Sequence, residues 1–71
     1  MSDFYYFYNQ VDKNNNHEVH KESCEYLPSP LNRTFIGYES DCRSALRRAK
    51  RDNPGKTFDG CYWCSRACHT G

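Results

Sequence analysis

The chain has 71 residues and contains few aliphatic side chains. Its valines, leucines and isoleucine are Val11, Val19, Leu27, Leu31, Ile36 and Leu46. This shortage, together with a mean hydropathy of -1.05, excludes a large aliphatic core. The length excludes a second domain, so we expect a single small domain over residues 1–71.

The sequence also lacks long apolar runs. No stretch approaches the roughly 20 apolar residues of a membrane helix. The first residues also lack the basic, apolar and small-residue segments of a secretory signal peptide. These two absences predict a protein without membrane association and with a cytoplasmic location.

Cysteine, by contrast, is abundant for so short a chain. The five cysteines are Cys24, Cys42, Cys61, Cys64 and Cys68. An odd number cannot pair completely within one chain, and cysteines in a reducing compartment stay as thiols. We therefore expect reduced cysteines that bind a metal or carry out redox chemistry, in preference to a disulfide framework.

A metal would also answer the question of how such a chain stays folded. Below about 70–80 residues, a hydrophobic core rarely supplies more than about 3–5 kcal/mol. Disorder is the weaker interpretation, because the net charge is only +1 and 15% of the residues are aromatic. We expect a bound ion to supply much of the folding free energy.

Three segments are predicted to form strands of a short antiparallel sheet. The first is the aromatic run at residues 4–8, and the second follows an Asn-rich turn at residues 17–20. The third covers residues 34–38. His17, which directly follows the turn, is expected to be solvated. The fold class is therefore α+β, a small zinc-stabilised domain with a sheet of about three strands packed on one amphipathic helix.

The helix is predicted over residues 40–52, with Ser40 as its N-cap. One stripe is apolar and comprises Cys42, Ala45, Leu46 and Ala49. On this stripe Cys42 is expected to be a small buried apolar residue. The opposite face is basic and carries Arg43, Arg47, Arg48, Lys50 and Arg51.

Two short ligand-type pairs indicate the metal site. His20 and Cys24 form an H-x3-C pair, and Cys61 and Cys64 form a C-x2-C pair within a tail that we expect to be a metal-binding turn. Each spacing allows both side chains to reach one ion, and one imidazole with three thiolates is a common closed Zn²⁺ site. The sequence predicts a zinc ion that joins two distant parts of the chain.

Other interpretations of these residues stay open at this point. The C-x2-C pair also occurs in redox proteins, although no βαβ pattern surrounds it here. A small disulfide-bonded protein is a second alternative. Cys68 and His69 lie close enough in sequence to replace one of the four ligands.

The order of these features resembles the Ada-type metal-binding domains. The shared pattern is an aromatic first strand, the segment Val19–Cys24, a strand, an alanine-containing helix and a terminal Gly60-Cys61-x-x-Cys64. In the Ada repair domain the first ligand is a cysteine that accepts a methyl group from DNA, whereas this chain has His20. A zinc-bound imidazole has committed its lone pair, so the resemblance does not imply that activity. It implies the accessory zinc module of the shorter, nuclease-attached relatives, which have a histidine at this position.

These features lead to three functional hypotheses. The first is a non-catalytic zinc module that contacts nucleic acid through the basic helix face, with Tyr62 and Trp63 as stacking surfaces. The second is an accessory module, such as those of phages or mobile elements, that uses exposed arginines and aromatic residues to bind a protein. The third is a zinc hydrolase with Glu22 or Glu25 as general base, although four good ligands would leave no open position.

Overall fold

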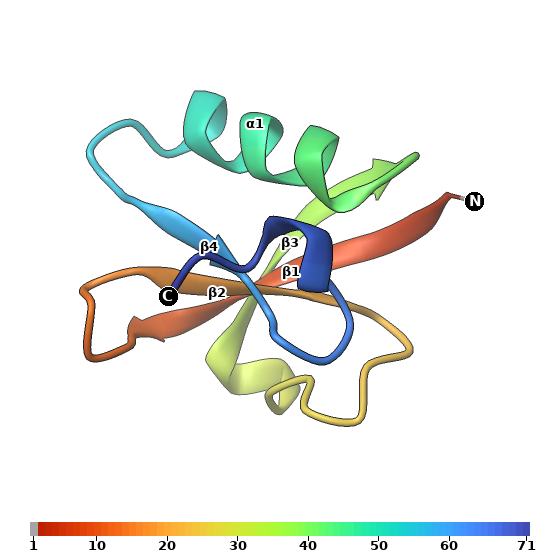
Figure 1. Ribbon diagram of the computed structural model, residues 1–71, viewed down its shortest axis with the longest axis horizontal. Helices are drawn as coiled ribbons and strands as arrows, with labels where there is room; N and C mark the ends of the chain where they lie inside the picture. Colours follow the sequence, from red (N-terminus) through yellow and green to blue (C-terminus); the bar gives the residue numbers. More distant parts are fainter. Residues whose placement is uncertain (1) are drawn as a thin grey trace.

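The computed structural model describes residues 2–71 and contains one α-helix against a four-stranded sheet. The elements in chain order are β1 (Asp3–Val11), β2 (His17–Lys21), η1 (Pro30–Asn32), β3 (Arg33–Glu39), α1 (Cys42–Asp52), β4 (Phe58–Gly60) and η2 (Arg66–Cys68). Figure 1 shows α1 lying across the sheet. The α+β class predicted from the sequence is confirmed.

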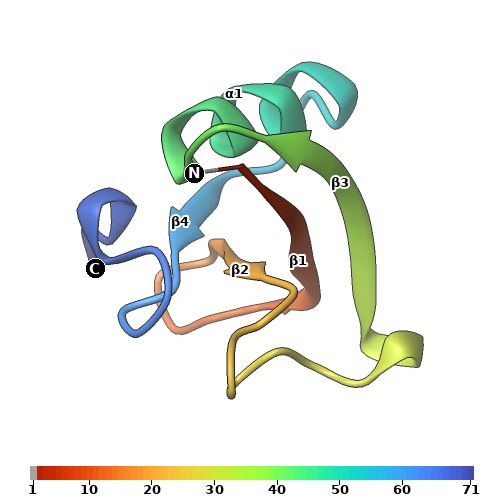
Figure 2. The ribbon, with the colours of Figure 1, turned by 90° about the vertical axis from the view of Figure 1, so that its right-hand side faces the viewer.

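The sheet has the strand order β3-β1-β2-β4. Both pairings made by β1 are antiparallel, whereas β4 pairs with β2 in parallel. Figure 2 shows the four strands in this order beneath α1, with η2 beyond the β4 edge. The three predicted strands are present and pair antiparallel as expected, but the sheet has a fourth strand that was not predicted, and it is parallel to its neighbour. The fourth strand has only three residues, which is too short for an alternating pattern to reveal.

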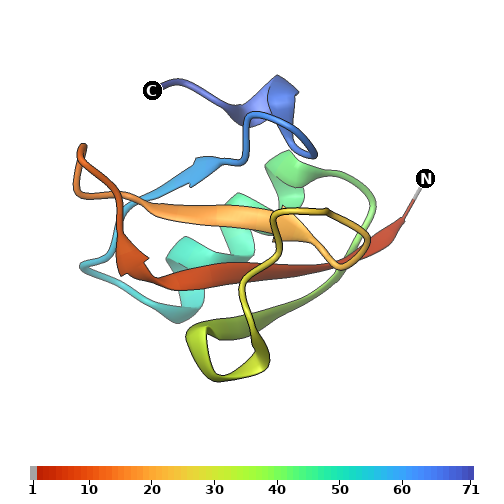
Figure 3. The ribbon, with the colours of Figure 1, turned by 90° about the horizontal axis from the view of Figure 1, so that it is seen from below.

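The core lies between α1 and the face of the sheet that α1 covers. In Figure 3, seen from below, β1 and β2 lie in front of the helix. The predicted apolar stripe of the helix is confirmed, because its buried residues are Cys42, Ala45 and Ala49. They pack on the buried sheet residues Tyr5, Phe7, Val19 and Ile36. The small alanine side chains leave room on the sheet for the rings of Tyr5 and Phe7, which are part of this core.

The helix begins two residues later than the sequence predicted. It starts at Cys42, and Asp41 is its N-cap, with the carboxylate Oδ1 accepting a hydrogen bond of 2.8 Å from the Ser44 backbone N–H. The prediction of Ser40 as N-cap is wrong. Aspartate caps a helix as well as serine does, and the extended backbone of Asp41 places its carboxylate at the Ser44 N–H.

His17 is buried rather than solvated, which corrects a second expectation. Only 6% of the residue is exposed, and its Nδ1 lies 2.8 Å from the Tyr8 carbonyl oxygen. Its ring packs against Phe7 and Phe58. The cause is β4, since Phe58 pairs with His17 and covers it.

A disulfide joins Cys42 of α1 to Cys68 of η2, with Cα atoms 6.3 Å apart. The expectation that all five cysteines stay reduced is wrong for this pair. Cys42 does lie in the core, but it is bonded rather than a free apolar residue. The disulfide depends on the close packing of η2 against β4. This packing requires glycine at position 60, because a Cβ on Gly60 would lie 2.5 Å from the Ser65 carbonyl oxygen.

The C-terminal residues are held by a buried carboxylate. Asp59 accepts hydrogen bonds from the backbone N–H groups of Thr70 and Gly71, at 2.8 and 3.1 Å. The Thr70 hydroxyl donates to the same carboxylate at 3.1 Å. Within residues 2–71 no helix has the length and apolar character needed to cross a membrane.

Candidate metal centre

The four predicted ligands lie at the ends of two neighbouring strands. His20 belongs to β2 and Cys24 follows it in a turn, whereas Cys61 and Cys64 follow β4. Because β2 and β4 are parallel neighbours, their C-terminal ends lie side by side at the same end of the strands. The Cys61 backbone N–H continues the pairing by donating to the Val19 carbonyl at 2.9 Å. The strand that the sequence did not predict is therefore what brings the two ligand pairs together.

The donor atoms of the four residues converge on one point. The ligand atoms offered by His20, Cys24, Cys61 and Cys64 all lie within 4.8 Å of one another. The Sγ atoms of Cys24 and Cys61 are 3.8 Å apart. Sulfurs placed tetrahedrally at about 2.3 Å from a zinc ion would be about 3.8 Å apart, so this spacing fits a tetrahedral metal site.

His20 is prepared for metal binding by its surroundings. The residue is 2% exposed, and its Nε2 lies 3.1 Å from the Glu18 carboxylate. Its Nδ1 is buried and has no hydrogen-bond partner within the part of the chain that the structure describes. An unpartnered buried nitrogen is costly unless something binds it. A carboxylate on the other ring nitrogen is the usual support for a metal-bound histidine, so Nδ1 is the candidate ligand atom.

Backbone N–H groups point at each of the three sulfurs. Lys21 donates to Cys64 Sγ at 3.3 Å, Tyr26 to Cys24 Sγ at 3.4 Å and Trp63 to Cys61 Sγ at 3.4 Å. Such bonds favour the thiolate over the thiol because they are stronger to a charged acceptor. The two turns therefore position the sulfurs and also stabilise their negative charge.

The three thiols differ in how readily they ionise without a metal. Burial opposes ionisation of Cys64, but the His20 side chain and the Lys21 N–H outweigh it and lower the pKa to about 6. Burial, followed by the hydrogen bond with Cys64, raises the pKa of Cys24 to about 12. Burial also raises the pKa of Cys61. Three thiolates this close repel one another, so a bound cation favours ionisation of the full set, and its binding releases protons.

Cys68 and His69 do not replace any of the four ligands. Cys68 is bonded to Cys42. The Nδ1 of His69 lies 2.9 Å from the Gly60 carbonyl oxygen and 3.6 Å from the Asp59 carboxylate. The geometry brings together His20, Cys24, Cys61 and Cys64, and the three cysteines of this quartet are free thiols.

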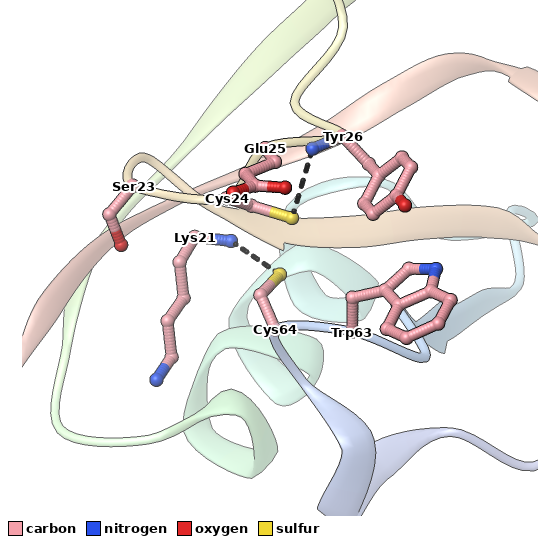
Figure 4. A pocket seen from close by; sticks show the side chains of 7 residues that line it. All are labelled: Lys21, Ser23, Cys24, Glu25, Tyr26, Trp63 and Cys64. Carbon is pink, nitrogen blue, oxygen red and sulfur yellow. Dashed lines mark hydrogen bonds between the residues drawn. The ribbon is translucent and has the colours of Figure 1, made fainter.

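A hollow of about 470 Å³ adjoins the sulfurs. Figure 4 shows the Tyr26 and Trp63 rings on one side of the Cys24 and Cys64 sulfurs and the Lys21 side chain on the other. Glu25 also lines the hollow. Glu22 does not, and it accepts a hydrogen bond of 2.9 Å from the Tyr6 hydroxyl.

The basic helix face is only partly free for contact with a partner. Arg48 pairs with Glu39 at 2.8 Å, and Arg51 pairs with Asp52 at 3.0 Å. Within residues 2–71, Arg43, Arg47 and Lys50 form no salt bridge. Arg47, Arg48 and Arg51 line a second hollow of about 420 Å³ together with Glu39 and Ser44.

Comparisons of the chain with protein-family models, with curated proteins and with solved structures found no match.

Proposed function

We propose that this protein is a non-catalytic zinc-binding module. The observation that carries the proposal is the convergence of one imidazole nitrogen and three sulfurs, from two separate parts of the chain, within 4.8 Å. Soft thiolates in a tetrahedral arrangement favour Zn²⁺ over the hard cations Mg²⁺ and Ca²⁺. The ion would join β2 to β4 and stabilise a fold whose core is small.

The ligand set argues against catalysis by the ion. Catalytic zinc sites use three protein ligands and keep the fourth position for water, whereas four ligands close the site. Glu22, one of the two candidate general bases, accepts a hydrogen bond from the Tyr6 hydroxyl instead of facing the sulfurs. We therefore prefer an accessory module to a hydrolase.

The Ada-type relationship agrees with this role and remains a proposal. The cytoplasmic location also remains a prediction, and the Cys42–Cys68 disulfide counts against it because such bonds persist mainly in oxidising compartments.

The zinc proposal is tested by native mass spectrometry of the purified protein. We expect one zinc ion per chain, and its loss in a Cys64→Ser variant. The matched control is Cys42→Ala/Cys68→Ala, which removes two cysteines outside the quartet and should keep the zinc. A wild-type chain without zinc after refolding in its presence would refute the proposal.

A second candidate function is nucleic-acid contact through α1, and the hollow lined by Arg47, Arg48 and Arg51 favours it. Arginine clusters bind phosphate through charge and paired hydrogen bonds. Arg47→Glu/Arg51→Glu should weaken DNA or RNA binding, with a smaller salt dependence than the wild type. Lys13→Glu/Lys56→Glu changes the net charge equally outside the helix and should have less effect. If the wild type binds neither nucleic acid at low salt, a protein partner becomes the better interpretation of this face.

A further inference from the structure

Three aromatic side chains form a continuous exposed surface beside the metal centre, and we call Tyr26, Trp63 and Tyr62 the aromatic shelf. The Tyr26 and Trp63 rings are 5.6 Å apart and nearly parallel, at 23°. Tyr62 meets Trp63 edge-on at 4.9 Å. The exposed fractions are 55% for Tyr26, 66% for Trp63 and 39% for Tyr62. The exposed parts of the Tyr26 and Trp63 rings, on the sides away from each other, are available to a ligand.

The shelf is fixed in place by the backbone of the metal-binding turns. Tyr26 donates its backbone N–H to Cys24 Sγ, and Trp63 donates its N–H to Cys61 Sγ. A metal that holds these sulfurs would hold the backbone from which both rings project. A preformed surface loses little conformational entropy when it binds.

One cation lies across the hollow from the shelf, and another lies on the Tyr62 ring. Lys21 lines the 470 Å³ hollow opposite the rings of Tyr26 and Trp63 (Figure 4). The Arg66 guanidinium lies 4.6 Å from the centre of the Tyr62 ring. Aromatic rings flanked by positive charge are the arrangement that binds single-stranded nucleic acid, with bases on the rings and phosphates at the cations.

The one acidic side chain of the hollow adds a base preference. Glu25 lines the same hollow as the two rings and can only accept hydrogen bonds when ionised. A carboxylate beside a stacked base accepts hydrogen bonds from the amino group of cytosine, whereas thymine offers it only the ring N3–H between two carbonyl acceptors, so a base with an amino group is favoured. The negative charge of Glu25 also disfavours a polyanion that would bind through its charge alone.

We propose that the aromatic shelf binds single-stranded nucleic acid, stacking bases on Tyr26 and Trp63, placing phosphates near Lys21 and Arg66, and preferring amino-bearing bases through Glu25. The inference deepens the proposed zinc module and rests on it, because the turns that carry the rings are the metal-binding turns. The shelf is separate from the arginine hollow of α1, and the two surfaces make different predictions.

The chain reports on this site directly, because Trp63 is its only tryptophan. Zinc-loaded protein is titrated at low salt with short oligodeoxycytidine, oligocytidine and oligothymidine, and Trp63 fluorescence is followed. We expect saturable quenching by both cytidine oligomers and weaker binding of oligothymidine. The relative affinities of the DNA and RNA probes show which sugar the site prefers. Inorganic polyphosphate, which has charge but no bases, should cause little quenching.

Variants separate the contributions of the individual side chains. Tyr26→Ala removes one ring and should weaken oligodeoxycytidine binding about tenfold or more. Lys21→Gln should lower the salt slope of log Kd by about 0.7. Glu25→Gln should keep the binding and reduce the preference for cytidine over thymidine. The control is Tyr38→Ala, a tyrosine of similar exposure, 57%, on β3, which should change nothing.

The zinc content of each sample is measured alongside the fluorescence, so that the two proposals can fail separately. Zinc-loaded protein without quenching would refute the shelf and leave the metal centre intact. Quenching in a wild type that holds no zinc would refute the metal centre and support the shelf. Equal weakening by Tyr38→Ala and Tyr26→Ala would refute the shelf. Binding that is lost in Arg47→Glu/Arg51→Glu and unchanged in Tyr26→Ala would place the nucleic acid on α1 instead.

Discussion

The core beneath α1 and the metal centre hold the same small domain in different ways. The core buries apolar side chains, which pack against one another without a bound ion. The centre brings a buried histidine close to three cysteine sulfurs, one of them buried and two half-buried. Without an ion this arrangement is unfavourable, because polar and negatively charged groups are crowded together. The core therefore favours the fold at any metal concentration, whereas the centre favours it only when an ion is bound.

Removing the ion should have the largest effect and would test this contrast most strongly. Structural zinc contributes about 10–16 kcal/mol in zinc-finger peptides, which exceeds what a core of this size supplies. We expect EDTA to collapse the NMR dispersion of the amide signals and added zinc to restore it. A spectrum that EDTA leaves unchanged would show that the core and the disulfide suffice without a metal.

The next largest effect should come from the disulfide, which links the helix of the core to η2. It closes a sequence separation of 26 residues, a loop length for which cross-linking stabilises by about 3–4 kcal/mol. Cys42→Ala/Cys68→Ala should lose about that much stability in urea unfolding while it retains zinc. The denatured, chelated wild type should show three free thiols without reductant and five with it. Five without reductant would contradict the disulfide.

A smaller effect should follow from removing the carboxylate behind His20. Glu18→Ala should lower zinc affinity about 10- to 100-fold, because the carboxylate orients the ring and raises its basicity. Competition with a fluorescent chelator measures the change. The control is Glu22→Ala, which removes a carboxylate that is hydrogen-bonded to Tyr6 and does not contact His20. Equal losses in both variants would mean that overall charge, and not the contact with His20, determines affinity.

The smallest effect should come from the N-cap, at the edge of the core. Asp41→Ala should lower Tm by about 4–8 °C in zinc-loaded protein, and Ser40→Ala should leave it unchanged. The Ser44 N–H holds the pKa of Asp41 below its usual value. The stabilisation by Asp41 is therefore present above its unfolded pKa and is lost as pH falls through the lower folded pKa. A calorimetric series in which wild type and Asp41→Ala respond identically to acid would contradict this cap.

The comparison also explains which features could be predicted from the sequence. The ligands His20, Cys24, Cys61 and Cys64 form two local pairs, so short-range spacing was enough to propose them. The buried helix stripe likewise follows from a local period. In both cases the signal lies within a few residues of chain.

The features that were missed depend on contacts between distant segments. β4 shows no pattern of its own and exists because it pairs with β2, and the burial of His17 follows from that pairing. The disulfide requires η2 to bring Cys68 next to Cys42 of α1, which no spacing rule reveals. The N-cap is Asp41 and not the adjacent Ser40, a difference of one residue that only the backbone geometry reveals.

The parallel pairing of β2 with β4 has a kinetic consequence. These strands are joined through β3 and α1, so their contact closes a long segment of chain, which is slow to form. A zinc ion that binds between the ends of β2 and β4 can stabilise their contact only after the two strands have met. The rate of refolding from denaturant should accordingly rise with the concentration of free zinc and then reach a plateau. At the plateau the meeting of β2 and β4, and not the binding of zinc, limits the rate.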